Sequence, residues 1–148
     1  MFVGKSAHTV TKDGRVSIPS KMREIMTDKY GSDELYVVLM PGNIICLFPS
    51  KEFEQLAEKL ENPQGGSLTN LMQVERDICS NAEYCKIDGS GRIVIPPDMK
   101  KVADIDQEVL IIGVRSHIEL WNPKVWEWNQ THRGSDTLRT WSGTQSAA

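Results

Sequence analysis

The chain has 148 residues, of which 39% are hydrophobic, and its 17 Lys and Arg against 20 Asp and Glu give a formal net charge of −3. This length suits one ordinary domain, or two very small ones that share a core. The negative balance argues against a polybasic nucleic-acid binder whose whole surface is cationic, but it leaves room for a local basic patch.

The sequence predicts neither a membrane span nor a secretory segment. The longest apolar run, residues 109–114, is far shorter than the ~20 residues that cross a bilayer. Residues 1–6 lack a charged region followed by an apolar one. The three cysteines, Cys46, Cys79 and Cys85, form no Cys-x-x-Cys pair. We therefore expect a protein of a reducing compartment, with no disulfide framework, no metal site and no cofactor.

A motif occurs twice in the chain, at an offset of 77 residues. Residues 12–23 align with residues 89–100 with five identities, where chance gives about one. The shared core of the motif is Gly-Arg-hydrophobic-x-Ile-Pro. Residues 48–53 and 121–126 also resemble each other, with an offset of 73. The chain is therefore predicted to contain a duplicated unit.

The first copy begins with a strand, a turn and a second strand. Residues 8–11 are β-prone, and Asp13 and Gly14 favour the tight turn of a hairpin. Residues 15–18 alternate in polarity, as a half-buried strand does. Pro19 ends this strand because proline cannot donate to a β-ladder.

A helix, a strand pair and a closing helix follow in the first copy. Ser20 is the expected N-cap of a short helix over residues 21–26. Residues 35–40 and 44–48 predict two strands joined by a Pro-Gly-Asn turn. Ser50 opens the closing helix, whose apolar face holds Phe53, Leu56, Ala57 and Leu60.

A break and a connecting helix separate the two copies. The Asn-Pro-Gln-Gly-Gly run at residues 62–66 interrupts the chain, and a helix is predicted from about residue 67 to residue 80. Its inward side chains are expected to be Leu68, Leu71, Met72, Ile78 and Cys79. Residues 132–148 are polar and lack periodicity, so we expect a mobile tail in which Trp141 alone is suited to docking.

The second copy predicts the same order of elements. Residues 84–87 form the first strand and Asp88-Gly89 the turn. Residues 93–95 are apolar throughout, which predicts a strand buried on both faces. The remaining expectations are Asp98 as the N-cap of a helix over 99–103, a strand pair at 109–113 and 117–121, and a closing helix opened by Asn122-Pro123.

Scattered histidines, aromatic residues and one cysteine indicate packing rather than chemistry. We expect strand or surface positions, and no ligand role, for His8, His117 and His132. We expect Trp121 and Trp126 in the core or at a subunit interface, and Cys85 as a small apolar filler. No carboxylate, histidine or serine stands at a spacing that suggests acid–base or nucleophilic catalysis, so we expect no enzyme.

The doubled motif resembles the MraZ family, which belongs to the AbrB/MazE-like swapped-hairpin superfamily of bacterial DNA-binding proteins. The resemblance extends to Met1-Phe2, to residues 74–76 and to residues 118–121, and it covers about residues 1–130. It implies an α+β fold of two tandem AbrB-like β-hairpin/helix units, packed as an intrachain pseudo-dimer with flanking helices. The implied divisions are a first unit at 1–62, a linker and connecting helix at 63–81, a second unit at 82–131 and a flexible tail at 132–148.

The resemblance also implies a function. Members of this family regulate transcription by binding short G-rich direct repeats in the promoter of their own cell-division and cell-wall gene cluster, as a ring of several chains. The implied partners are double-stranded DNA and other copies of the chain, with no membrane, no small-molecule substrate and no cofactor. The implied location is the nucleoid in the cytoplasm.

The family's DNA-contacting motif is Asp-x-x-x-Arg. The second copy keeps this motif, whereas a threonine replaces its aspartate in the first copy, so a carboxylate partner for Arg15 would have to come from Asp13. The residues implied in DNA binding are Thr11, Lys12, Asp13, Gly14, Arg15, Asp88, Gly91 and Arg92. From the residues alone, each arginine either reaches DNA phosphate or guanine, or is a structural partner of the nearby aspartate.

The charge distribution favours the first copy as the stronger contact. Residues 1–30 carry a formal balance of +3, residues 31–80 one of −5 and the remainder one of −1. The acidic connection also supports an alternative function, an antitoxin-like or structural protein-binding oligomer without specific DNA binding.

Overall fold

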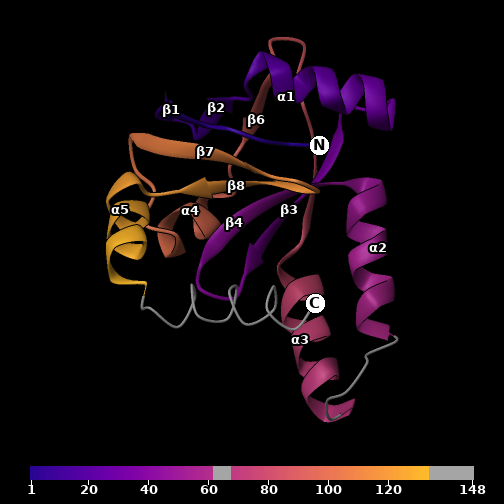
Figure 1. Cartoon of the computed structure of the whole chain (residues 1–148). Helices are drawn as coiled ribbons and strands as arrows, with labels where there is room; N and C mark the ends of the chain where they lie inside the picture. The colour runs from indigo at the N-terminus through magenta and orange to yellow at the C-terminus, as the bar shows by residue number, and fades with distance from the viewer. Residues whose placement is uncertain (62–67, 134–148) are drawn as a thin grey trace, which may run out of the picture.

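The fold is α+β and antiparallel throughout the part of the chain that the computed structural model describes, residues 1–61 and 68–133 (Figure 1). The expectations for the tail beyond residue 133, including Trp141, lie outside these residues. A six-stranded sheet has the order β1-β7-β8-β4-β3-β5, and β2 and β6 form a separate ribbon. No helix in the described ranges is long and apolar enough to span a membrane.

The elements have the following bounds. The strands are β1 (Lys5–Thr9), β2 (Arg15–Ser17), β3 (Glu34–Met40), β4 (Ile44–Pro49), β5 (Glu83–Lys86), β6 (Arg92–Val94), β7 (Glu108–Val114) and β8 (His117–Trp121). The helices are α1 (Ser20–Ile25), which continues as the π-helical segment η1 (Met26–Tyr30), then α2 (Ser50–Glu61), α3 (Leu68–Asn81), α4 (Pro97–Val102) and α5 (Pro123–His132).

Strands from the two copies of the motif interleave. The tight turns form as predicted, but the expected local hairpins do not, because β1 pairs with β7, β5 pairs with β3, and β2 pairs with β6. The physical reason is burial: Val16 and Ile93 lie opposite each other in the ribbon and are 1% and 2% exposed. Pairing across the copies therefore encloses apolar side chains that a local hairpin would leave uncovered.

The pairing between the copies is reciprocal. The backbone N–H of Ile18 donates to the carbonyl of Gly91 at 2.9 Å, and that of Ile95 donates to the carbonyl of Gly14 at 2.8 Å. Each of these hydrogen bonds is the counterpart of the other, because Ile18 aligns with Ile95 and Gly14 aligns with Gly91 at the offset of 77. The two copies of the motif are thus related by an approximate twofold axis that passes between Val16 and Ile93.

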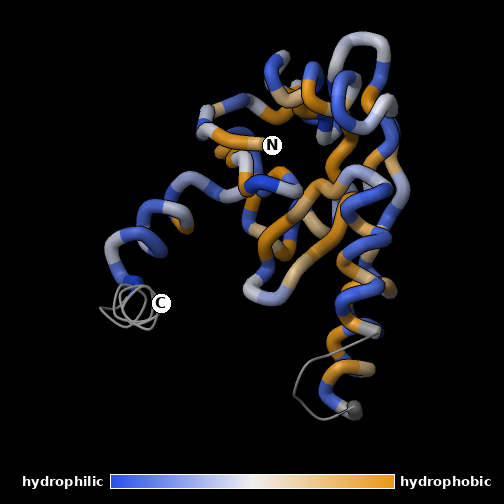
Figure 2. The backbone as a smooth tube through the Cα atoms, turned by 45° about the vertical axis from the view of Figure 1, so that its right-hand side comes forward, coloured by the Kyte–Doolittle hydropathy of each residue, from blue (hydrophilic) through white to orange (hydrophobic). Residues whose placement is uncertain are grey.

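The core lies on both faces of the large sheet. One face packs against the ribbon, α1 and α4, and its fully buried side chains include Leu35, Leu47, Ile111 and Ile118. The other face holds a smaller cluster beneath α2 and α3. Figure 2 shows the consequence, since the sheet strands are mostly hydrophobic while α2 and α3 alternate between hydrophobic and hydrophilic turns.

The second strand pair and the closing helix predicted for each copy are confirmed. Strands β3 and β4 pair around the Pro-Gly-Asn turn, and β7 pairs with β8. Phe53, Leu56 and Leu60 of α2 pack on the smaller cluster. The Asn122 side chain caps α5 by accepting from the backbone N–H groups of Lys124 and Val125 at 2.7 and 3.2 Å.

Both N-cap predictions for the short helices are wrong. The N-cap residues are Pro19 and Pro96, and neither cap has a side-chain hydrogen bond. Ser20 is already the first residue of α1, and Asp98 lies in the first turn of α4. The prolines that end the strands have φ near −55° with an extended ψ, and the helix begins at the next residue.

Three burial predictions are also wrong. Val94 is 46% exposed because no layer within residues 1–61 and 68–133 covers the outer face of the ribbon. Met72 is 50% exposed and Cys79 is exposed, whereas Ile78 is buried against the sheet. Helix α3 extends beyond the sheet edge (Figure 1), so in the described part of the chain the sheet covers only part of its expected inward face.

Candidate nucleic-acid interface

The turn of the first copy brings all of its predicted site residues together. The backbone N–H of Thr11 donates to the carbonyl of Arg15 at 2.9 Å, and the N–H of Gly14 donates to the carbonyl of Thr11 at 3.0 Å. The Thr11 hydroxyl accepts from the backbone N–H of Arg15 at 2.9 Å and donates to Asp13. Asp13 in turn forms an ion pair with Arg15. Lys12 is exposed at the tip.

The turn of the second copy has the same backbone hydrogen bonds as the first. One carboxylate, that of Asp88, takes the place of the Thr11 and Asp13 side chains. The N–H of Asp88 donates to the carbonyl of Arg92 at 2.9 Å. The Asp88 carboxylate accepts from the N–H groups of Ser90 and Arg92 at 2.8 and 3.0 Å, and it lies 3.6 Å from the Arg92 guanidinium. The N–H of Arg92, with that of Ser90 and the positive charges of Arg92 and Arg15, holds the pKa of Asp88 below its usual value.

The two arginines lie on one exposed face of the ribbon. Arg15 stands opposite Val94 and Ser17 opposite Arg92, while Val16 and Ile93 point into the core between them. Residues directly opposite in an antiparallel pair share a face. Both arginine side chains are about equally accessible, 38% for Arg15 and 40% for Arg92. The structure therefore exposes the arginine of the second copy as much as the arginine of the first, and on the same face of the ribbon.

The sequence prediction missed two cations that flank these turns. The Arg23 guanidinium occupies the space beside Gly91, 2.7 Å from where a side chain on that glycine would begin, and its Nε donates to the carbonyl of Ile18. Lys100 lines a hollow with Thr11 and Lys12 at the other turn. Each turn thus has a cation from the helix of the other copy. The repeat alignment contains this information, because Arg23 and Lys100 are aligned at the offset of 77.

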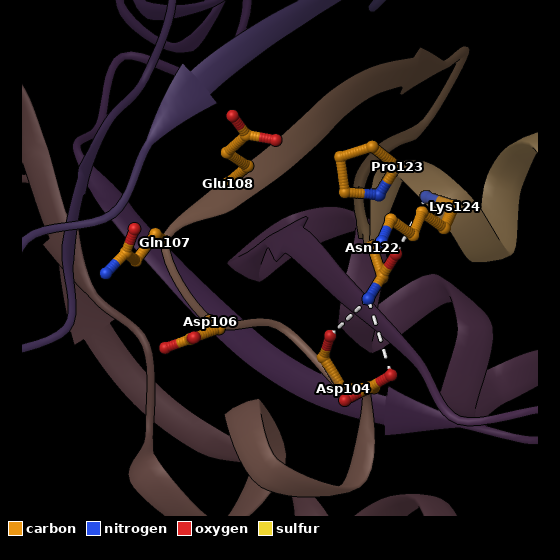
Figure 3. A pocket seen from close by; sticks show the side chains of 7 residues that line it. All are labelled: Asp104, Asp106, Gln107, Glu108, Asn122, Pro123 and Lys124. Atoms are coloured by element: carbon orange, nitrogen blue, oxygen red, sulfur yellow. Dashed lines mark hydrogen bonds between the residues drawn. The ribbon is translucent and has the colours of Figure 1, made fainter.

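A neighbouring open hollow, which shares Asp106 and Gln107 with the hollow at Lys100, has the opposite charge. It has a volume of about 350 Å³ and is lined by Asp104, Asp106, Gln107, Glu108, Asn122, Pro123 and Lys124 (Figure 3). Its central amide, Asn122, donates to the carbonyl of Asp104 at 2.5 Å and is the cap of α5. The Asp106 carboxylate points away from this amide (Figure 3). Carboxylates disfavour phosphate, so this hollow is not part of the candidate interface.

The fold and the candidate interface together define a class: a small α+β protein in which two copies of one motif interleave to present a two-stranded ribbon with arginines on its outer face. A family model described as "MraZ protein, putative antitoxin-like" matches residues 1–73 and 78–136. The chain belongs to the MraZ family, a family of transcriptional regulators and not of enzymes.

Named relatives agree with this assignment. Transcriptional regulator MraZ of Geobacter sp. (strain M21) is 33% identical over 137 residues, covering 85% of this chain and 86% of the relative. The protein of the same name from Mycoplasmoides gallisepticum is 36% identical over 129 residues, covering 86% and 85%. The solution structure of PHS018 from Pyrococcus horikoshii aligns with 82% of this chain and 99% of its own at 16% identity, but the TM-score of 0.36 does not establish a shared fold.

Proposed function

We propose that this chain is a sequence-specific DNA-binding regulator that places the β2–β6 ribbon in the major groove of promoter DNA. The supporting observation is the shared exposed face of Arg15 and Arg92 on a two-stranded antiparallel ribbon. The major groove of B-DNA admits such a ribbon, and arginine binds guanine O6 and N7 there with two hydrogen bonds. Arginines on the exposed face of such a ribbon are therefore suited to reading base edges in that groove.

The turn residues have supporting roles in this proposal. Asp13 and Asp88 pair with the two arginines and hold them beside the turns, and Thr11 shapes the first turn. Gly14 and Gly91 adopt φ values of +81° and +78°, which only glycine takes without strain, and so form the tight turns beside the two arginines. Lys12, together with Arg23 and Lys100, contacts phosphates on either side of the groove.

We further propose that the chain consists of two tandem AbrB-like units, at residues 1–62 and 82–131, joined by residues 63–81 and packed as an intrachain pseudo-dimer. The reciprocal hydrogen bonds at Ile18 and Ile95 support this division. Several such chains assemble into a ring at the nucleoid and bind direct repeats in the promoter of the chain's own gene cluster. Exposed apolar side chains on α3 and α5, among them Met72 and Trp128, support contacts between copies.

A mobility-shift titration of full-length variants on DNA from upstream of the gene tests this site. We expect Arg15→Ala and Arg92→Ala each to weaken specific binding by about 1–3 kcal/mol per binding site, with the mass of the oligomer unchanged. Arg15→Lys should keep weak, non-specific binding and lose preference for the repeats, because lysine cannot form the two parallel hydrogen bonds. The control is Arg133→Ala, which removes an exposed arginine after α5. Normal binding by Arg15→Ala would show that the proposed site is wrong.

The family description as antitoxin-like supports a second candidate, a protein-binding oligomer that does not bind DNA specifically. Its binding surface would be the outer side of α2, which is rich in glutamate. Co-purification of a stoichiometric protein partner, with no retention on promoter DNA, would favour this candidate over the first.

A further inference from the structure

Three metal-ligating side chains meet near the centre of the large sheet, away from the ribbon. Cys46 on β4 lies directly opposite Glu119 on β8, and His117 lies two residues before Glu119 on the same face. The ligand atoms of Cys46, His117 and Glu119 are all within 4.8 Å of one another. The cysteine is 2% exposed, and the other two side chains are 17% and 18% exposed.

We propose that Cys46, His117 and Glu119 bind a divalent transition-metal ion of the zinc class. Zinc binds Cys, His and Glu at about 2.0–2.3 Å, which places tetrahedral ligands roughly 3.3–3.8 Å apart. The observed cluster is within about 1 Å of that spacing. A thiolate with an imidazole excludes magnesium and calcium, which prefer all-oxygen sites. Three protein ligands leave the fourth position to water.

Neighbouring side chains already orient two of the three ligands, Glu119 and His117. The Trp121 indole N–H donates to one oxygen of Glu119 at 2.9 Å, which leaves the other oxygen facing His117 Nε2 at 3.0 Å. The Ser116 hydroxyl lies 3.3 Å from His117 Nδ1, and the Phe48 ring stacks on the imidazole with centroids 4.8 Å apart. Outer partners of this kind fix the orientation of metal ligands and are typical of metal sites.

Without a metal ion, a hydrogen bond joins His117 Nε2 to Glu119 at 3.0 Å. A metal ion binds cysteine as the thiolate, so binding would release the Cys46 thiol proton to solvent and replace this hydrogen bond.

The position of the cluster gives the site a structural consequence. Strand β4 comes from the first half of the chain and β8 from the second, and they are neighbours only in the folded sheet. A metal ion that joins Cys46 to His117 and Glu119 would therefore crosslink the two halves. Because the unfolded chain has no such site, binding adds to the stability of the fold.

Cobalt and zinc binding to the tag-free, full-length protein test the site after treatment with a chelator and a reductant. We expect one equivalent of Co²⁺ to produce a sulfur-to-cobalt charge-transfer band, and Zn²⁺ to abolish this band and to raise the melting temperature by several degrees. Cys46→Ser should lose both effects. The matched controls, Cys79→Ser and His132→Asn, change an exposed cysteine and an exposed histidine outside the cluster and should keep both.

A second variant keeps the test decisive if Cys46→Ser does not fold. Glu119→Gln preserves the shape of the side chain and an oxygen that accepts from Trp121, and it should weaken cobalt binding at least about tenfold. The proposal is overturned if the wild-type protein shows no charge-transfer band at excess Co²⁺. It is equally overturned if the band survives in Cys46→Ser, or if Glu119→Gln binds cobalt as tightly as the wild type.

Discussion

At the residue scale, the two turns build the same backbone with different side chains. In the second turn, Asp88 both accepts from the N–H of Arg92 and faces its guanidinium. In the first turn these tasks are divided, because Thr11 accepts from the N–H of Arg15 and Asp13 pairs with its charge. Asp13 therefore supplies the carboxylate partner of Arg15, as the sequence predicts for a motif in which threonine replaces aspartate at position 11.

Gly14 gives a prediction at this scale. It has a φ of +81°, and a methyl group there would lie 3.3 Å from the carbonyl oxygen of Ile95. We expect Gly14→Ala to lower the free energy of unfolding by about 1–2 kcal/mol, the cost of a left-handed conformation for a residue with a side chain. The measurement is urea unfolding, with Gly89→Ala as control, since Gly89 is exposed and no atom lies within 4 Å of an added methyl group. Equal stability of the two variants would contradict this account of the turn.

The candidate residues differ in how far the sequence predicts them. Arg15 and Arg92 follow from a short motif that occurs twice in the chain, and the same alignment pairs Arg23 with Lys100. The metal-ligating cluster has no such spacing. Cys46 and His117 are 71 positions apart and meet only because β4 and β8 are adjacent in the sheet. We predicted a surface or strand position with no ligand role for His117, because the sequence does not contain that adjacency.

At the element scale, the strand pairings predicted correctly are those between strands adjacent in sequence, and the wrong ones involve strands whose actual partners are distant in sequence. The pairs β3–β4 and β7–β8 are joined by short turns, so alternation and turn residues suffice to predict them. The partners of β1, β2, β5 and β6 lie in the other copy. Their choice depends on which apolar faces are buried together, and no local pattern encodes it.

The N-terminal segment gives a prediction for one element. Phe2 is fully buried and exchanges two backbone hydrogen bonds with Arg115, at 2.9 and 2.8 Å, before β1 begins. We expect Phe2→Ala to destabilise the protein by about 3–5 kcal/mol, the usual cost of removing a buried phenyl ring. The comparison is Val3→Ala, whose side chain is 64% exposed. Thermal unfolding should separate the two variants clearly, and similar melting temperatures would mean that the segment is not anchored as described.

At the scale of the whole molecule, the charge is divided in space. The net charge of −3 includes glutamates on α2 and the acidic hollow near α5, whereas arginines and lysines gather around the ribbon turns. One ribbon offers few cations, and each phosphate that it neutralises adds only a salt-sensitive increment of affinity. An assembly that presents several ribbons to several repeats makes the later contacts intramolecular. The proposed assembly would bind weakly through one chain and selectively through many.

Binding to promoter DNA that carries different numbers of the direct repeat tests this central claim most directly. Titrations of the full-length protein, over a series of salt concentrations and alongside its mass in solution, would measure the affinity for one repeat and for several. The account predicts a steep gain in affinity with each added repeat, a steep loss with salt, and the disappearance of the gain in Arg15→Ala. An affinity that does not depend on repeat number, or a gain that Arg15→Ala retains, would contradict it.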